Sequence, residues 1–156
     1  MPKQPTPRLI ALDPGDKHVG VALFERRPDT LLRWACIVAY EMGPTEAVDS
    51  LADMLRDGDL DTIVYERFAL YLDKAAEQAG STMETAQMIG VIRYLHRTLA
   101  DHTKVALVEQ PASIKKPTRS LVKRRGIKPV APKTAGDHAR DSELHGWHWI
   151  LRGGSA

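Results

Sequence analysis

Short apolar runs with strand-like composition fill the first quarter of the chain. The runs at 8–13 and 19–24 are separated by Asp13-Pro14-Gly15-Asp16, residue types that favour a tight turn. A third run, 31–40, is again rich in apolar and β-favouring residues and is expected to pair with the second. The pattern therefore predicts three strands, of which the first two form a hairpin.

Helical and strand-like patterns alternate in the rest of the chain. Apolar residues recur at helical spacing from Ala47 to Leu55, which predicts a helix that the Asp57-Gly58-Asp59 turn ends. Later segments predict, in order, a strand at 60–66, a helix at 81–99, a strand at 104–108, a partly helical basic segment around Pro117 at 113–125, and a helix at 134–151.

The order β-β-β-α-β-α-β-α predicts an α/β fold with a mixed five-stranded sheet flanked by helices. Strands that alternate with helices usually run parallel with the helices on the sheet faces. At 156 residues the chain fits one domain, with flexible ends expected at 1–7 and 152–156. No run is long and apolar enough for a signal peptide or a bilayer span, so we expect a cytoplasmic protein without a membrane partner.

Basic residues are concentrated in one segment, although the net charge is only +2. Residues 110–136 contain eight Lys or Arg and no Asp or Glu. A basic block in a nearly neutral chain indicates a polyanionic partner, although a solvated loop would look the same. The candidate phosphate contacts are Lys115, Lys116, Arg119, Lys123, Arg124 and Arg125.

Acidic residues stand at the ends of predicted elements. Asp13 ends the first strand and Glu66 ends the fourth, so the two carboxylates emerge at one sheet end if these strands are central neighbours. His138 and Asp141 share a face of the last helix, and Asp137 shares it with Asp141. Clustered carboxylates repel unless a cation compensates, and oxygen ligands favour Mg²⁺ or Mn²⁺. Two such ions can support phosphodiester hydrolysis.

Each of these residues also has a structural explanation. Asp13 before Pro14-Gly15 is a common turn former. Glu66 can form a surface ion pair with Arg67. Asp137 and Asp141 at a helix start can complement the helix dipole.

The segments Ile10-Ala11-Leu12-Asp13-Pro14-Gly15, Ile63-Val64-Tyr65-Glu66 and His138-Ala139-Arg140-Asp141 together resemble the RuvC family of Holliday junction resolvases, especially its compact bacteriophage members. The resemblance covers nearly the whole chain and implies an RNase H-like fold. It also implies that Asp13, Glu66 and Asp141 bind catalytic Mg²⁺ or Mn²⁺, with two ions in each site. His138 stands where other members have Asp or His, and it either binds a metal or orients the attacking water. Asp137 is the competing candidate for this place.

The resemblance also implies branched DNA as the partner. The segment after Glu66 contains Phe68 and Tyr71, where members of the family carry an aromatic that inserts near the junction centre, although core packing explains either residue equally well. A four-way junction is nearly two-fold symmetric, so we expect a homodimer. The 81–99 helix, with the small residues Ala86 and Gly90, resembles the family's dimerisation helix, although core packing explains its apolar stripe equally well. Alternatives are a nuclease for flaps, forks or RNA-containing duplexes, and a non-catalytic branched-DNA binding protein. An actin-like nucleotide-binding fold would need two lobes, which 156 residues do not supply.

Overall fold

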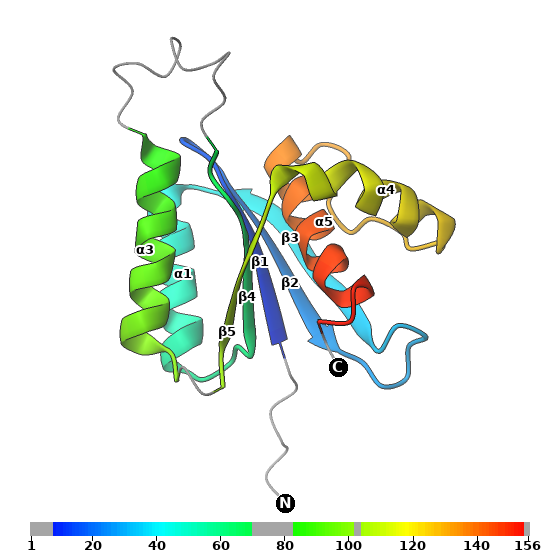
Figure 1. The fold of residues 1–156 in the computed structure, drawn as a ribbon, viewed down its shortest axis with the longest axis horizontal. Coiled ribbons are helices and arrows are strands. Elements are labelled where there is room, and N and C mark those ends of the chain that lie inside the picture. The colour runs from blue at the N-terminus through cyan, green and yellow to red at the C-terminus, as the bar shows by residue number, and fades with distance from the viewer. Residues whose placement is uncertain (1–7, 70–82, 102–103, 155–156) are drawn as a thin grey trace, which may run out of the picture.

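The computed structural model describes residues 8–69, 83–101 and 104–154. Their strands form one sheet with helices on both faces (Figure 1). The elements are β1 (Arg8–Pro14), β2 (Val19–Arg26), β3 (Trp34–Met42), α1 (Pro44–Arg56), β4 (Thr62–Glu66), α3 (Glu84–Leu99), β5 (Ala106–Gln110), a 3-10 turn (Ala112–Ile114), α4 (Lys115–Arg124) and α5 (Asp137–Leu151).

The sheet has the order β3-β2-β1-β4-β5 and is mixed, as predicted. β1 pairs antiparallel with β2, and β2 pairs antiparallel with β3, whereas β1 pairs parallel with β4 and β4 parallel with β5. The prediction that the first and fourth strands are central neighbours is therefore confirmed. Leu12 lies opposite Tyr65 in the β1–β4 ladder, so the next residues, Asp13 and Glu66, emerge at the same end of the sheet.

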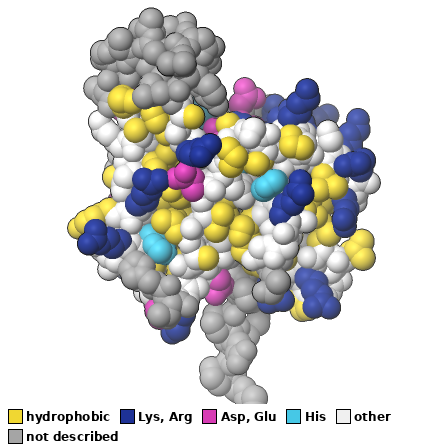
Figure 2. Space-filling model, viewed as in Figure 1, with side chains coloured by type: hydrophobic (Ala, Val, Ile, Leu, Met, Phe, Trp, Pro, Cys, Tyr) yellow, Lys and Arg dark blue, Asp and Glu magenta, His cyan; other side chains and the backbone are white. Residues whose placement is uncertain are grey.

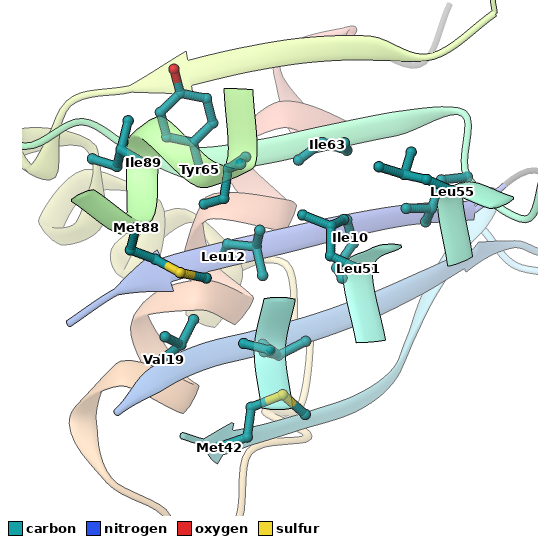
Figure 3. Packing of buried hydrophobic residues seen from close by; sticks show 14 of the residues in the cluster. Ile10, Leu12, Val19, Met42, Leu51, Leu55, Ile63, Tyr65, Met88 and Ile89 are labelled. Carbon is teal, nitrogen blue, oxygen red and sulfur yellow. The ribbon is translucent and has the colours of Figure 1, made fainter. Parts of the chain in front are cut away.

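The central strand β1 is buried on both faces because helices cover both sides of the sheet. Ile10 and Leu12 point into the core that α1 and α3 cover, together with residues labelled in Figure 3 such as Leu51. Leu9 and Ala11 point into the second core, which contains residues of α5. A strand covered on two faces reads as an unbroken apolar run, and this is why the alternation typical of a half-exposed strand is missing from β1.

Several predicted boundaries differ from the structure, among them the helix expected at 81–99, which begins at Glu84, and the strand expected at 60–66, which begins at Thr62. The third strand begins at Trp34 and not at Leu31, because the residues before Trp34 form turns in which Leu31 is 96% exposed and Arg33 has a φ of 57°. The fifth strand is shifted by two residues, to Ala106–Gln110. The last helix begins at Asp137, since residues 132–135 make a turn before it.

The basic segment is more regular than predicted. After the 3-10 turn it forms the continuous helix α4, and Pro117 does not interrupt this helix. Pro117 is the third residue of α4, within the first turn, where backbone N–H groups have no partner inside the helix. The proline ring therefore removes no helical hydrogen bond.

The chain ends fall partly outside the described residues. The predicted flexible end at 1–7 and residues 155–156 are not described. Residues 152–154 form a turn whose backbone N–H groups donate to carbonyls of α5. Among the described residues, no helix combines the length and the apolar composition needed to cross a membrane.

Candidate active site

Two carboxylates lie side by side at the carboxyl end of β1 and β4. Asp13 is 4% exposed, and the Glu66 side chain is also largely buried. Burial raises the pKa of Asp13, the hydrogen bond with His138 opposes that rise, and the nearby charge of Glu66 adds to it. The net pKa of Asp13 is raised, as expected where a second acid shares the site.

Helix α5 adds a histidine and a third carboxylate to this end of the sheet. Nδ1 of His138 lies 2.7 Å from Oδ2 of Asp13, and this hydrogen bond raises the pKa of His138 although burial opposes it. The Asp141 side chain is 19% exposed and faces the same site. Asp137, in contrast, has a 93% exposed side chain that pairs with Arg140 at 3.7 Å. The structure thus brings His138 and Asp141 into the cluster and leaves Asp137 outside it.

Two glycines allow α5 to lie this close to the sheet. Gly20 pairs with Asp13 in the β1–β2 ladder, and a Cβ atom at Gly20 would overlap the backbone carbonyl of His138. A Cβ at Gly15 would press against the His138 ring. Glu41 of β3 fixes the helix start, because its Oε1 accepts the backbone N–H of His138 at 3.0 Å, a favourable place for a carboxylate near a helix N-terminus.

Lys115, at the start of α4, joins two of the carboxylates. Its Nζ donates to Oε2 of Glu66 at 2.9 Å and to Oδ2 of Asp141 at 2.8 Å. Burial lowers the pKa of Lys115, but the two hydrogen bonds outweigh burial and the net pKa is raised. The amine is therefore a fixed positive charge between the acids. Lys115 was predicted to contact DNA, and no sequence pattern indicated this position between two acids.

Glu66 is held from the other side by His145, which Gln110 in turn orients, and neither residue was among the predicted site residues. His145 of α5 is fully buried, and its Nε2 donates to Oε2 of Glu66 at 2.8 Å while Nδ1 lies 2.8 Å from Oε1 of Gln110. Burial raises the pKa of Glu66, but the hydrogen bonds with His145 and Lys115 outweigh it and lower the pKa. The available signal was spacing, since His138, Asp141 and His145 share one helical face.

The donor set suits a hard divalent cation. Asp13, Glu66 and Asp141 offer carboxylate oxygens and His138 offers a ring nitrogen, a combination that fits Mg²⁺ or Mn²⁺. Within the described part of the chain, however, no three His, Cys, Asp or Glu side chains are grouped closely enough to hold one ion as they stand. Lys115 lies between Glu66 and Asp141, so ion binding there requires its amine to move.

The remaining predicted DNA contacts lie along α4. Arg119 is one turn beyond Lys115, with its guanidinium 3.9 Å from Asp141, and Lys123 follows one turn later on the same face. The other three, Lys116, Arg124 and Arg125, are exposed. Lys and Arg side chains gather on the right-hand side of Figure 2, where Figure 1 places α4.

Phe68, one of the two candidate aromatic residues, contacts the hydrophobic core. Phe68 is partly buried and packs against the core beneath α1 and α3, as its structural explanation requires. It also lines a pocket beside Glu66 and Pro14. Tyr71 lies outside the described residues.

Comparison with known proteins finds similarity in structure but not in sequence. No protein-family model and no curated protein matches the chain. The RuvC of Thermus thermophilus in complex with a Holliday junction substrate superposes with a TM-score of 0.65 at 13% identity, over 96% of this chain and 97% of that one. The fowlpox virus resolvase in complex with Holliday junction DNA gives 0.61 at 14% identity, over 93% and 97%.

A third similar structure is the yeast mitochondrial Holliday junction resolvase Ydc2. It superposes with a TM-score of 0.62 at 16% identity, over 96% of this chain and 80% of that one. The chain therefore has the RuvC-like form of the RNase H-like fold, over nearly its whole length.

Proposed function

We propose that this chain is an endonuclease that resolves Holliday junctions by Mg²⁺- or Mn²⁺-dependent hydrolysis of phosphodiester bonds. The observation that carries the proposal is the convergence of Asp13, Glu66, His138 and Asp141 at one end of the sheet. This convergence lies beside a basic helix, and the fold is one that other proteins use in complexes with Holliday junction DNA. We also propose that the chain is a compact member of the bacteriophage type.

The proposed roles follow from the chemistry of each side chain. Asp13, Glu66 and Asp141 would hold the ions. Bound ions would supply a polarised phosphate and a more acidic water. His138 keeps its orientation through the Nδ1 bond to Asp13, which leaves Nε2 as the ring nitrogen that would bind an ion or orient the attacking water. His145 would hold Glu66 in one orientation, because its buried ring bonds Glu66 through Nε2 and is itself fixed by Gln110 through Nδ1.

The basic residues of α4 would bind the DNA backbone. Lys116, Arg119, Lys123, Arg124 and Arg125 present cationic groups on the helix that starts at the acid cluster. Contacts of this type carry no sequence information, and each one releases counterions. Backbone binding beside the acids would bring a phosphate close to the proposed metal site.

Reversing the charge of Lys123, Arg124 and Arg125 together should weaken junction binding and flatten its salt dependence. Three phosphate contacts correspond to a decrease of about 2–3 in the slope of log K against log salt concentration. Titration of labelled junctions at several salt concentrations measures this slope. The single change Arg26→Glu, at the exposed end of β2, is the control and should leave the slope nearly unchanged. An unaltered slope in the triple variant would exclude the carboxyl-terminal end of α4 as a DNA contact.

We further propose that the protein acts as a homodimer that uses α3. On the outer face of this helix Val91 is 36% exposed and Tyr94 is 65% exposed, and a Cβ at Gly90 would meet nothing within 4 Å. An apolar helix face of this kind, with a small residue beside it, suits close packing against a second copy. Two copies related by a two-fold axis would present two sites to a junction.

The direct test is cleavage of three matched substrates, a four-way junction, a flap and a linear duplex, with Mg²⁺ present. We expect the junction to be cut fastest, with paired nicks at symmetric positions on two opposing strands. Sequencing gels of strands labelled at each end map these nicks. A preference for the flap would favour the alternative nuclease, and binding without any cut would favour a non-catalytic branched-DNA binding protein. Single unpaired nicks would contradict the dimer.

A further inference from the structure

Lys115 is held by two acids from two different elements. Glu66 ends β4, Asp141 lies on α5, and Lys115 starts α4. Charge-assisted hydrogen bonds of 2.8 and 2.9 Å are among the stronger polar contacts in proteins. With only 23% of its side chain exposed, the amine is fixed in the cluster and is not a freely solvated surface lysine.

The contacts of Lys115 use oxygens that a metal ion would need. Oε2 of Glu66 accepts from both Lys115 and His145, and Oδ2 of Asp141 accepts from Lys115. A dication bound to Glu66 and Asp141 would stand within a few ångströms of the ammonium group. Like charges at that separation repel strongly in a partly buried site. The ammonium and a divalent ion therefore compete for these two carboxylates in the observed arrangement.

We propose that Lys115 is an internal cation that neutralises Glu66 and Asp141 until a divalent metal displaces it, and that the released amine then binds a DNA phosphate. The inference rests on the proposed metal-dependent function. Lys115 then has two alternative partners, the carboxylates in the metal-free protein and the DNA backbone in the metal-bound protein.

The position of Lys115 on α4 supports the second partner. Arg119 lies one turn further on the same helix face, and Lys116 is the exposed neighbour, so a lysine that leaves the acids enters the basic surface proposed for DNA. The metal takes the carboxylates and the DNA takes the amine of Lys115, two groups that otherwise bind each other. Binding of either ligand therefore favours binding of the other. Without metal, the same lysine stays paired with Glu66 and Asp141 inside the protein.

The test is the affinity of the full-length protein for Mn²⁺ without DNA, measured by titration calorimetry. Lys115→Met removes the competing charge and keeps the length of the side chain, so Mn²⁺ should bind at least about tenfold more tightly than to the wild type, because two charge-assisted hydrogen bonds no longer oppose it. The adjacent exposed residue gives the matched control. Lys116→Met makes the same change in net charge and should alter the affinity by less than about twofold.

Thermal unfolding gives a second readout that needs no DNA. Without metal, Lys115→Met should melt below the wild type, because Glu66 and Asp141 lose their counter-charge. Saturating Mn²⁺ should remove most of this difference. Lys115→Arg retains the charge and is the second variant if the Met variant does not fold. It should bind Mn²⁺ no more tightly than the wild type does.

The possible results separate this inference from the proposed function. If the wild type binds Mn²⁺ and Lys115→Met binds it equally or more weakly, the displacement model is wrong and the metal site stands. If neither protein binds Mn²⁺, both the metal site and the displacement model fail. Tighter binding by Lys115→Arg than by the wild type would also overturn the model.

Discussion

Replacing Asp13 by Asn, or Glu66 by Gln, should abolish Mg²⁺-dependent junction cleavage while junction binding changes by less than about threefold. Each substitution keeps the shape of the side chain and removes its negative charge. Loss of residues that merely support metal ligands costs about 10- to 100-fold in activity or metal affinity, so loss of a ligand should cost at least about 100-fold. Single-turnover cleavage of a labelled junction measures the rate, and an electrophoretic binding assay in Ca²⁺ measures the affinity.

Asp137→Asn is the matched control for these two changes. It makes the same chemical substitution at an acid whose side chain is 93% exposed and points away from the cluster. We expect its cleavage rate to stay within about threefold of the wild type, since a surface ion pair contributes little. A normal rate in Asp13→Asn would rule out the proposed chemistry, and a large loss in Asp137→Asn would return Asp137 to the list of ligands.

Gly20→Ala is expected to reduce both stability and cleavage, because the added methyl group collides with the helix that carries His138. The new Cβ would overlap the backbone of His138, which no side-chain rotation can relieve, so α5 must move away from β2. Such overpacking should reduce the free energy of unfolding by about 2–4 kcal/mol, measured by urea denaturation. Because His138 would shift relative to Asp13, cleavage by the folded variant should fall by about 10- to 100-fold.

Gly43→Ala is the control for the added methyl group. A Cβ at Gly43 meets nothing within 4 Å, and its φ of −65° is accessible to alanine. This residue caps α1, where exchange of Gly for Ala changes stability by only a few tenths of a kcal/mol to about 1 kcal/mol. Equal destabilisation by the two variants would mean that Gly20 has no special contact with α5.

The acids at the ends of the strands could be predicted from sequence because their positions depend on regular structure. Once β1 and β4 are recognised as neighbouring strands, Asp13 and Glu66 follow at one end of the sheet. Helical periodicity likewise places His138 and Asp141 on one face of α5. It also placed Asp137 with Asp141, and the structure shows the limit of that argument, since the first residue of the helix points into solvent.

The contacts that tune the site could not be predicted in this way. His145 bonds both Gln110 and Glu66 only because β5 and α5 both pack beside β4, and Glu41 of β3 contacts the start of α5. These partners are separated by 35 to 97 residues along the chain. No local periodicity relates residues at such separations.

The sequence by itself determined the element order and the acids at the ends of the first and fourth strands, because each of these depends on spacing along one segment. Only the tertiary structure decided that Lys115 lies between Glu66 and Asp141, whereas composition placed it with the DNA-binding lysines. A basic side chain pairs with the anionic groups that lie close to it in the folded protein. That distance is set by how α4, α5 and β4 pack together.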